Sequence, residues 1–99
     1  MITMIRTASI IPGQQVKARA FAKEFAAILK ATNGTETCVS VPIGGNPNRI
    51  RITAHHENLA ALETSMTRLA NNPAYLELLA RGPDLFVSGT LFDEIWRDA

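Results

Sequence analysis

The chain alternates between two kinds of hydrophobic spacing, and this order constrains its fold more than any other feature. Four segments carry the β-branched and apolar residues typical of strands: residues 2–11, 35–43, 48–56 and 85–96. Between them, residues 14–31 and 58–82 repeat apolar side chains with the period of an amphipathic helix. The sequence therefore predicts one α+β domain over residues 1–99. It is a ferredoxin-like β-α-β-β-α-β fold with a four-stranded antiparallel sheet in the order 4-1-3-2 and two helices on one face.

Turn-forming residues divide these segments. Asn33-Gly34 ends the first predicted helix, and Asn72-Pro73 interrupts the second and restarts it, because Asn caps a helix and Pro suits its first turn. The sequence Gly44-Gly45-Asn46-Pro47 predicts a four-residue hairpin turn, and Ser88-Gly89 predicts a bend in the last strand.

The two middle strands pair well in one register. A hairpin around residues 44–47 sets Val39 opposite Ile52, so that apolar side chains meet on one face of the sheet. The other face then receives the polar pairs, which are Glu36 with His55, Cys38 with Thr53, and Ser40 with Arg51. The agreement on both faces predicts this register.

The predicted helices cover only one face of the sheet, yet apolar side chains fall on both faces. The first strand has Ile2 and Met4 on one face and Ile5 on the other, and the last strand places Phe92 and Trp96 together. Leaving such side chains in water costs about 1.5–3 kcal/mol each. We therefore expect a homodimer through the open sheet face.

The charge balance excludes several classes of partner. Ten Lys and Arg against nine Asp and Glu leave a net charge of +1, and charged residues make up only 19% of the chain. Nucleic acid is not an expected partner, since the first and third strands also lack stacking aromatic residues. No apolar run reaches the length of a membrane span, no basic segment precedes an apolar one, and Cys38 has no disulfide partner. We expect a soluble, cytoplasmic protein without membrane contact.

Short motifs add a resemblance that covers nearly the whole chain. They are Ile5-Arg6-Thr7, Ile11-Pro12-Gly13, Asn48-Arg49-Ile50 and Glu57-Asn58-Leu59. With the element order, they make the chain similar to NIPSNAP-like proteins and to the dimeric α/β-barrel superfamily of antibiotic-biosynthesis monooxygenases. The resemblance implies a homodimeric barrel with a ligand pocket between sheet and helices in each protomer. It also implies cofactor-independent oxygenation or isomerisation of a small aromatic or polyketide-like molecule.

Three residues are candidates for catalysis. His55 shares a face with Glu57 and lies opposite Glu36, so a carboxylate could hold it as a general base. His55 and His56 point to opposite faces and cannot share a metal ion, and we expect no metal site. Arg51 and Arg6, together with Arg49, could hold a carboxylate or enolate. The alternatives are a polar strand end for the histidines and, for the arginines, interface ion pairs with Glu36, Asp93 or Glu94.

Trp96, Tyr75 and Ser40 are the candidate ligand-binding residues. Trp96 could stack on an aromatic ligand, or it could be a core or dimer contact. Two functions stay open: an enzyme without cofactor, in which a cavity is reached by polar side chains, and a non-catalytic ligand-sensing or assembly module. A third possibility is haem binding through a histidine.

Overall fold

The computed structural model describes residues 1–99. Its elements in chain order are β1 (Ile2–Ser9), α1 (Gln15–Asn33), β2 (Thr37–Ser40), β3 (Arg49–His56), α2 (Leu59–Ala70), α3 (Pro73–Arg81), a 3-10 turn η1 (Gly82–Asp84) and β4 (Phe92–Arg97). The predicted order is confirmed, with the second helical segment split into α2 and α3. The split falls at Asn72, whose side chain accepts hydrogen bonds from the first two free N–H groups of α3.

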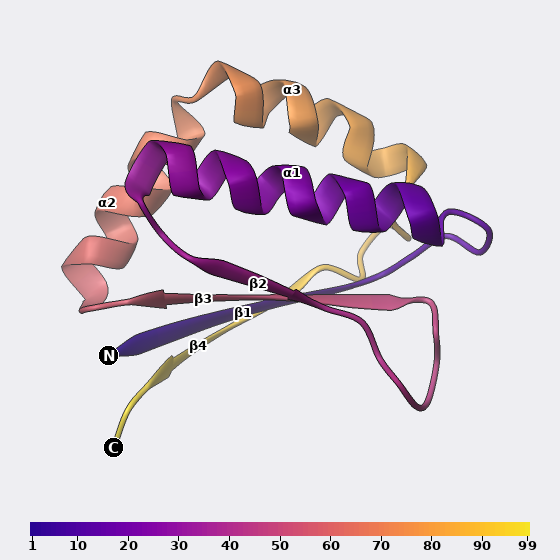
Figure 1. The fold of residues 1–99 in the computed structure, drawn as a ribbon, viewed down its shortest axis with the longest axis horizontal. Helices are drawn as coiled ribbons and strands as arrows, with labels where there is room; N and C mark the ends of the chain where they lie inside the picture. Colours follow the sequence, from indigo (N-terminus) through magenta and orange to yellow (C-terminus); the bar gives the residue numbers. More distant parts are fainter.

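The four strands form one antiparallel sheet in the order β2-β3-β1-β4. This is the predicted order counted from the other edge, and the α+β ferredoxin-like class is confirmed. All three helices lie on the same side of the sheet, and the opposite side has no element over it (Figure 1). We call that uncovered side the open face. No helix is long and apolar enough to cross a membrane.

The hairpin register is confirmed where β2 and β3 pair, from Thr37 opposite Ala54 to Ser40 opposite Arg51. The predicted four-residue turn is wrong, because the ladder stops at Ser40 and residues 41–48 form a longer loop. Pro42 lacks the N–H that a longer ladder needs. The predicted pairing of Glu36 with His55 also lies outside the ladder, and Glu36 instead pairs with Lys30, at 3.0 Å between Oε1 and Nζ.

The last strand is shorter than the predicted 85–96. Gly89 has a φ of +80°, a conformation that breaks an extended strand and that glycine adopts at little cost. Ahead of it, Phe86 makes one isolated bridge to Ile10, and the Val87 N–H donates to the Ser9 carbonyl. The segment 85–91 therefore follows the edge of β1 as a loop, with the predicted bend at Ser88-Gly89.

The core lies between α1 and the sheet. Small residues, Ala18 and Ala22, allow α1 to approach the strands, and Phe25 fills the space beside them. The strand residues that meet them alternate along β1 and β3, namely Ala8, Ile10, Ile50 and Ile52. Leu78 brings α3 into the same cluster and has no exposed surface.

We predict that Leu78→Ala destabilises the fold by about 2–5 kcal/mol, because it leaves a cavity in the core. Leu76→Ala on the same helix is the matched control. Its side chain is 53% exposed, and we expect a change within about 0.5 kcal/mol. Urea unfolding followed by circular dichroism measures both. Equal losses for the two variants would contradict the placement of α3.

Candidate functional site

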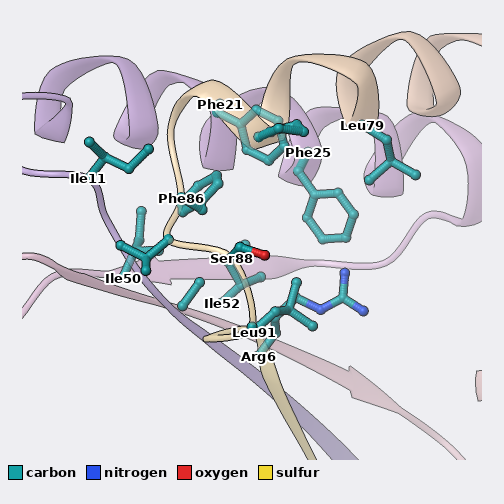
Figure 2. Close-up of a pocket in the computed structure, with 15 residues that line it drawn as sticks. Arg6, Ile11, Phe21, Phe25, Ile50, Ile52, Leu79, Phe86, Ser88 and Leu91 are labelled. Carbon is teal, nitrogen blue, oxygen red and sulfur yellow. The ribbon is translucent and has the colours of Figure 1, made fainter.

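An apolar cleft lies between the helices and the sheet. Its volume is about 570 Å³, within the range of small-molecule sites. Figure 2 shows Phe21 and Phe25 of α1 above the space, Ile50 and Ile52 of β3 below it, and Phe86 of the 85–91 segment beside it. Leu79 and Leu91 also line it, and both are largely exposed at its rim. We call this space the outer cleft.

The aromatic side chains of the outer cleft support one another. The rings of Phe21 and Phe86 meet edge to face, with centroids 5.2 Å apart. The ring of Phe25 lies 5.8 Å from that of Tyr75, which comes from α3. Helix α1 and the segment before β4 thereby form an aromatic wall on which a flat apolar molecule can pack.

Arg6 is the charged side chain of the outer cleft. Strand β1 alternates so that Arg6 points toward the helices between the buried Met4 and Ala8. Asp93 lies directly opposite on β4 and accepts two hydrogen bonds, from Nε and Nη2 of Arg6, each of 2.8 Å. The hydrogen bond with Asp93 raises the pKa of Arg6, so the guanidinium stays charged. Asp93 uses two of its five N–H groups, and a hydrogen bond with Tyr75 also raises the pKa of Arg6.

A second space adjoins the outer cleft at Arg6 and Phe25, which line both. Its volume is about 220 Å³. Its other polar side chains are His56 from β3, Ser65 from α2 and Tyr75 from α3. We call it the inner chamber. Apolar residues complete its wall, including Met4, Leu62 and Met66.

His56 is 8% exposed, and this burial, together with the charge of His55, lowers its pKa from 6.5. It is therefore neutral at pH 7 and can accept a proton.

The candidate residues fall on two faces of the sheet. Arg6 lines both spaces under the helices, and Tyr75 lines the inner chamber. The remaining candidates lie elsewhere, because side chains alternate along a strand. His55, Arg51, Ser40 and Trp96 occupy register positions on the open face, next to Thr3 and Thr7 of β1.

The expected convergence of Arg6 with Arg49 and Arg51 is therefore wrong. Arg51 pairs with Thr7, while Arg6 pairs with Ile52, so the guanidinium groups leave the sheet on opposite sides. His55 is exposed, and its Nδ1 lies 3.1 Å from the Thr3 hydroxyl rather than beside a carboxylate. Arg49, Arg51 and Ser40 border a shallow depression of about 240 Å³ on the open side of the sheet.

Two polar residues were not among the candidate site residues, namely His56 in the inner chamber and Asp93, which was expected only as an ion-pair partner of the arginines. His56 follows Ala54 by two residues, so the hairpin register already places it with Ile50 and Ile52 under the helices. Asp93 depends on the register between β1 and β4, which are far apart in the sequence and give no local signal. No three His, Cys, Asp or Glu side chains gather to hold a metal ion.

The comparisons with known proteins concern the fold. No protein-family model and no curated protein matches the chain. By its sheet order and helical layer the chain belongs to the ferredoxin-like α+β class of folds.

Within that class, solved structures of NIPSNAP and antibiotic-biosynthesis-monooxygenase-like proteins match it over its whole length, at identities that show the fold alone. Atu4242 from Agrobacterium tumefaciens, a NIPSNAP family protein of unknown function, matches at 23% identity and a TM-score of 0.85, over 100% of this chain and 94% of its own. An uncharacterised NIPSNAP domain protein from Burkholderia xenovorans matches at 15% identity and a TM-score of 0.84, over 100% of this chain and 95% of its own. A candidate antibiotic biosynthesis monooxygenase from Deinococcus radiodurans matches at 19% identity and a TM-score of 0.77, over 100% of this chain and 93% of its own.

We predict that the His56 side chain makes stability fall as the pH drops below about 6.5. Its folded-state pKa lies below the 6.5 of the free side chain, so the unfolded state binds a proton first as the pH falls. The free energy of unfolding should decrease below about pH 6.5, and His56→Asn should flatten this decrease. His55→Asn is the matched control and should keep most of it, because burial is the larger cause of the shift. Urea unfolding at several pH values measures this. A wild-type slope in His56→Asn would contradict it.

Proposed function

We propose that this chain is a homodimeric α/β-barrel protein that binds a small hydrophobic or aromatic molecule in the outer cleft. The observation that carries the proposal is an unfilled, largely apolar space of about 570 Å³ with one paired guanidinium in its wall. Apolar walls with a few placed polar groups are typical of small-molecule sites. The aromatic residues Phe21, Phe25 and Phe86 favour a ligand with a flat ring system.

Cofactor-independent oxygenation or isomerisation is the reaction that we propose for such a ligand. Both reactions pass through an enolate or phenolate, and a charged donor in a water-poor cleft stabilises the negative oxygen. Arg6 can supply this donor, since Asp93 fixes its orientation and uses only two of its N–H groups. The neighbour from Deinococcus radiodurans, a candidate antibiotic biosynthesis monooxygenase, supports this reaction class by its fold.

The second candidate function is a non-catalytic ligand-sensing or assembly module. A pure assembly module is expected to fill the space between helices and sheet with side chains, and the open cleft argues against it. A ligand sensor would bind its ligand in the same cleft as an enzyme but would not convert it. A panel of anthrone- and quinol-type compounds distinguishes the two: oxygen consumption or product formation supports the enzyme, while binding without turnover supports the sensor.

Self-association is proposed for the open face. Two aromatic residues of β4, Phe92 and Trp96, lie on this face, with 61% and 58% of their surface exposed. Arg51 on β3 and Glu94 on β4 share that face, so a two-fold arrangement of two copies can pair opposite charges beside the apolar side chains of the edge strand β4. The apolar area and the mixed charges together favour a second copy of this chain as the occupant.

We predict that a bulky side chain at the rim of the outer cleft blocks the ligand. Leu79→Trp should weaken binding of anthrone at least tenfold, since its indole enters the space that the ligand needs. Leu76→Trp is the matched control, because it lies on the same helix, is similarly exposed and does not line the cleft. Fluorescence titration and thermal shift measure binding. Equal affinities in the two variants would place the ligand elsewhere.

We predict that Phe92→Glu yields a monomer, because it places a charge among the apolar side chains that β4 presents on the open face. Val16→Glu, at an exposed position of α1 on the helical side, should leave the dimer intact. Size-exclusion chromatography with light scattering at micromolar concentration measures the mass. A monomeric wild-type protein under these conditions would contradict the proposed dimer.

A further inference from the structure

The inner chamber holds more polar side chains than the binding of an apolar ring needs. It continues the outer cleft beyond Arg6 and Phe25, which line both spaces. Its polar side chains come from four different elements: Arg6 from β1, His56 from β3, Ser65 from α2 and Tyr75 from α3. A ligand whose ring lies in the outer cleft can therefore extend a polar end past Arg6 into this chamber.

His56 lies where the inner chamber approaches the surface. With Ser65, it lines the chamber on one side and a shallow polar depression of about 470 Å³ on the other. That depression is open to solvent and is bordered by Glu36, His55, Glu57 and Arg68. A proton taken up by the imidazole from inside the chamber therefore has a route to solvent through the same side chain.

The chamber also holds a partner for a negative oxygen. The Arg6 side chain is about three-quarters buried, and its guanidinium lies 5.9 Å from the centroid of the Phe25 ring, at the boundary of the two spaces. Its bidentate contact with Asp93 fixes it there, and a further hydrogen bond with Tyr75 also engages the guanidinium. A base and an anion donor thus line one small chamber at different positions, with His56 opposite Ile2 and Arg6 opposite Ile52 in the pairing of β1 with β3.

On the basis of the proposed ligand cleft, we propose that His56 is the catalytic base of this protein, removing the proton from a phenol or enol hydroxyl of the ligand in the inner chamber. The O–H bond of the ligand breaks, its electron pair stays on the oxygen as a phenolate or enolate, and the proton forms an N–H bond on the imidazole. The negative charge spreads through the conjugated ligand toward Arg6, which lies four residues along the sheet from His56. The imidazolium then returns its proton to solvent or to the product.

The surroundings of His56 suit this step. Burial lowers its pKa, so the imidazole is in the base form at neutral pH. The titratable and charged groups that surround it are Arg6 from β1, Tyr75 from α3, Arg68 from α2, His55 and Glu57 along the chain, and Glu36 from the segment before β2. The carboxylates lie on the solvent side and the guanidinium of Arg6 on the chamber side. A proton that leaves the chamber through His56 therefore moves toward the negative groups.

A pair of probes tests the inference apart from the proposed function. 4-Nitrophenol reports its own ionisation, because its phenolate absorbs visible light, while 4-nitroanisole has the same ring and no acidic proton. At a pH about one unit below the pKa of free 4-nitrophenol, wild-type protein should raise the ratio of phenolate to phenol about tenfold in the bound probe, equal to one pKa unit. His56→Asn and His56→Gln should abolish this rise, and His55→Asn should keep it.

The binding of 4-nitroanisole serves as the control for folding and for the cleft. Wild type and the variants at positions 55 and 56 should bind it with affinities within about threefold of one another. If 4-nitroanisole binds but 4-nitrophenol stays a phenol in wild type, or ionises equally in both variants at position 56, His56 is not the base. If neither probe binds to wild-type protein, the proposed ligand cleft itself is refuted.

Discussion

The ion pair between Arg6 and Asp93 is the interaction on which the candidate site depends. A guanidinium under a layer of helices is costly to bury unless a carboxylate meets it in good geometry. The two parallel hydrogen bonds of 2.8 Å provide that geometry across adjacent strands. They also connect the edge strand β4 to β1 at a place where the helical layer leaves β4 uncovered, since Leu91 and Ile95 are more than half exposed. Asp93 of β4 therefore holds the charged group in the wall of the cleft, at its boundary with the inner chamber.

The sequence predicted the parts of the fold that depend on local spacing. Apolar periodicity placed α1, and the Asn72-Pro73 pair placed the break between α2 and α3, because capping and proline geometry act within one turn. The β2–β3 register followed from matching two short neighbouring strands face by face. The β1–β4 register did not, since these strands are separated by most of the chain and no short turn fixes their alignment. Asp93 was therefore predicted only as one of three possible ion-pair partners of the arginines, and the structure identifies it as the partner of Arg6 within the same chain.

The candidate site was harder to predict, because several of the polar residues chosen as candidates lie on the open face and not under the helices. His55 and Arg51 stand out in the sequence, yet alternation puts them on the open face with Thr3 and Thr7. The cleft is built mostly of residues such as Phe21, Phe25 and Ile52, whose spacing is also that of an ordinary core. Whether such residues fill the space or leave it empty depends on how α1 and the 85–91 segment sit on the sheet, and no pattern in the sequence encodes this. The position of His56 could have been predicted from the sequence, since the hairpin register alone places it under the helices.

The same two strands carry both proposed binding events, and this connects them. Along β1 and β4, Arg6 and Asp93 face the helices, while their immediate neighbours Ile5, Glu94 and Phe92 face the other way. A second copy that covers the open face restrains β4 from below, and the position of β4 sets where Asp93 holds Arg6. If association and ligand binding both occur, each shifts the same edge strand. Suppose that the ligand binds more tightly when β4 is restrained. Linkage then requires that the ligand raises the affinity of association by the same factor by which association raises the affinity for the ligand. In the proposed dimer the two open faces cover each other, which accounts for the low fraction of charged residues in the chain. The cleft of each copy then lies on the other side of its sheet, under the helices.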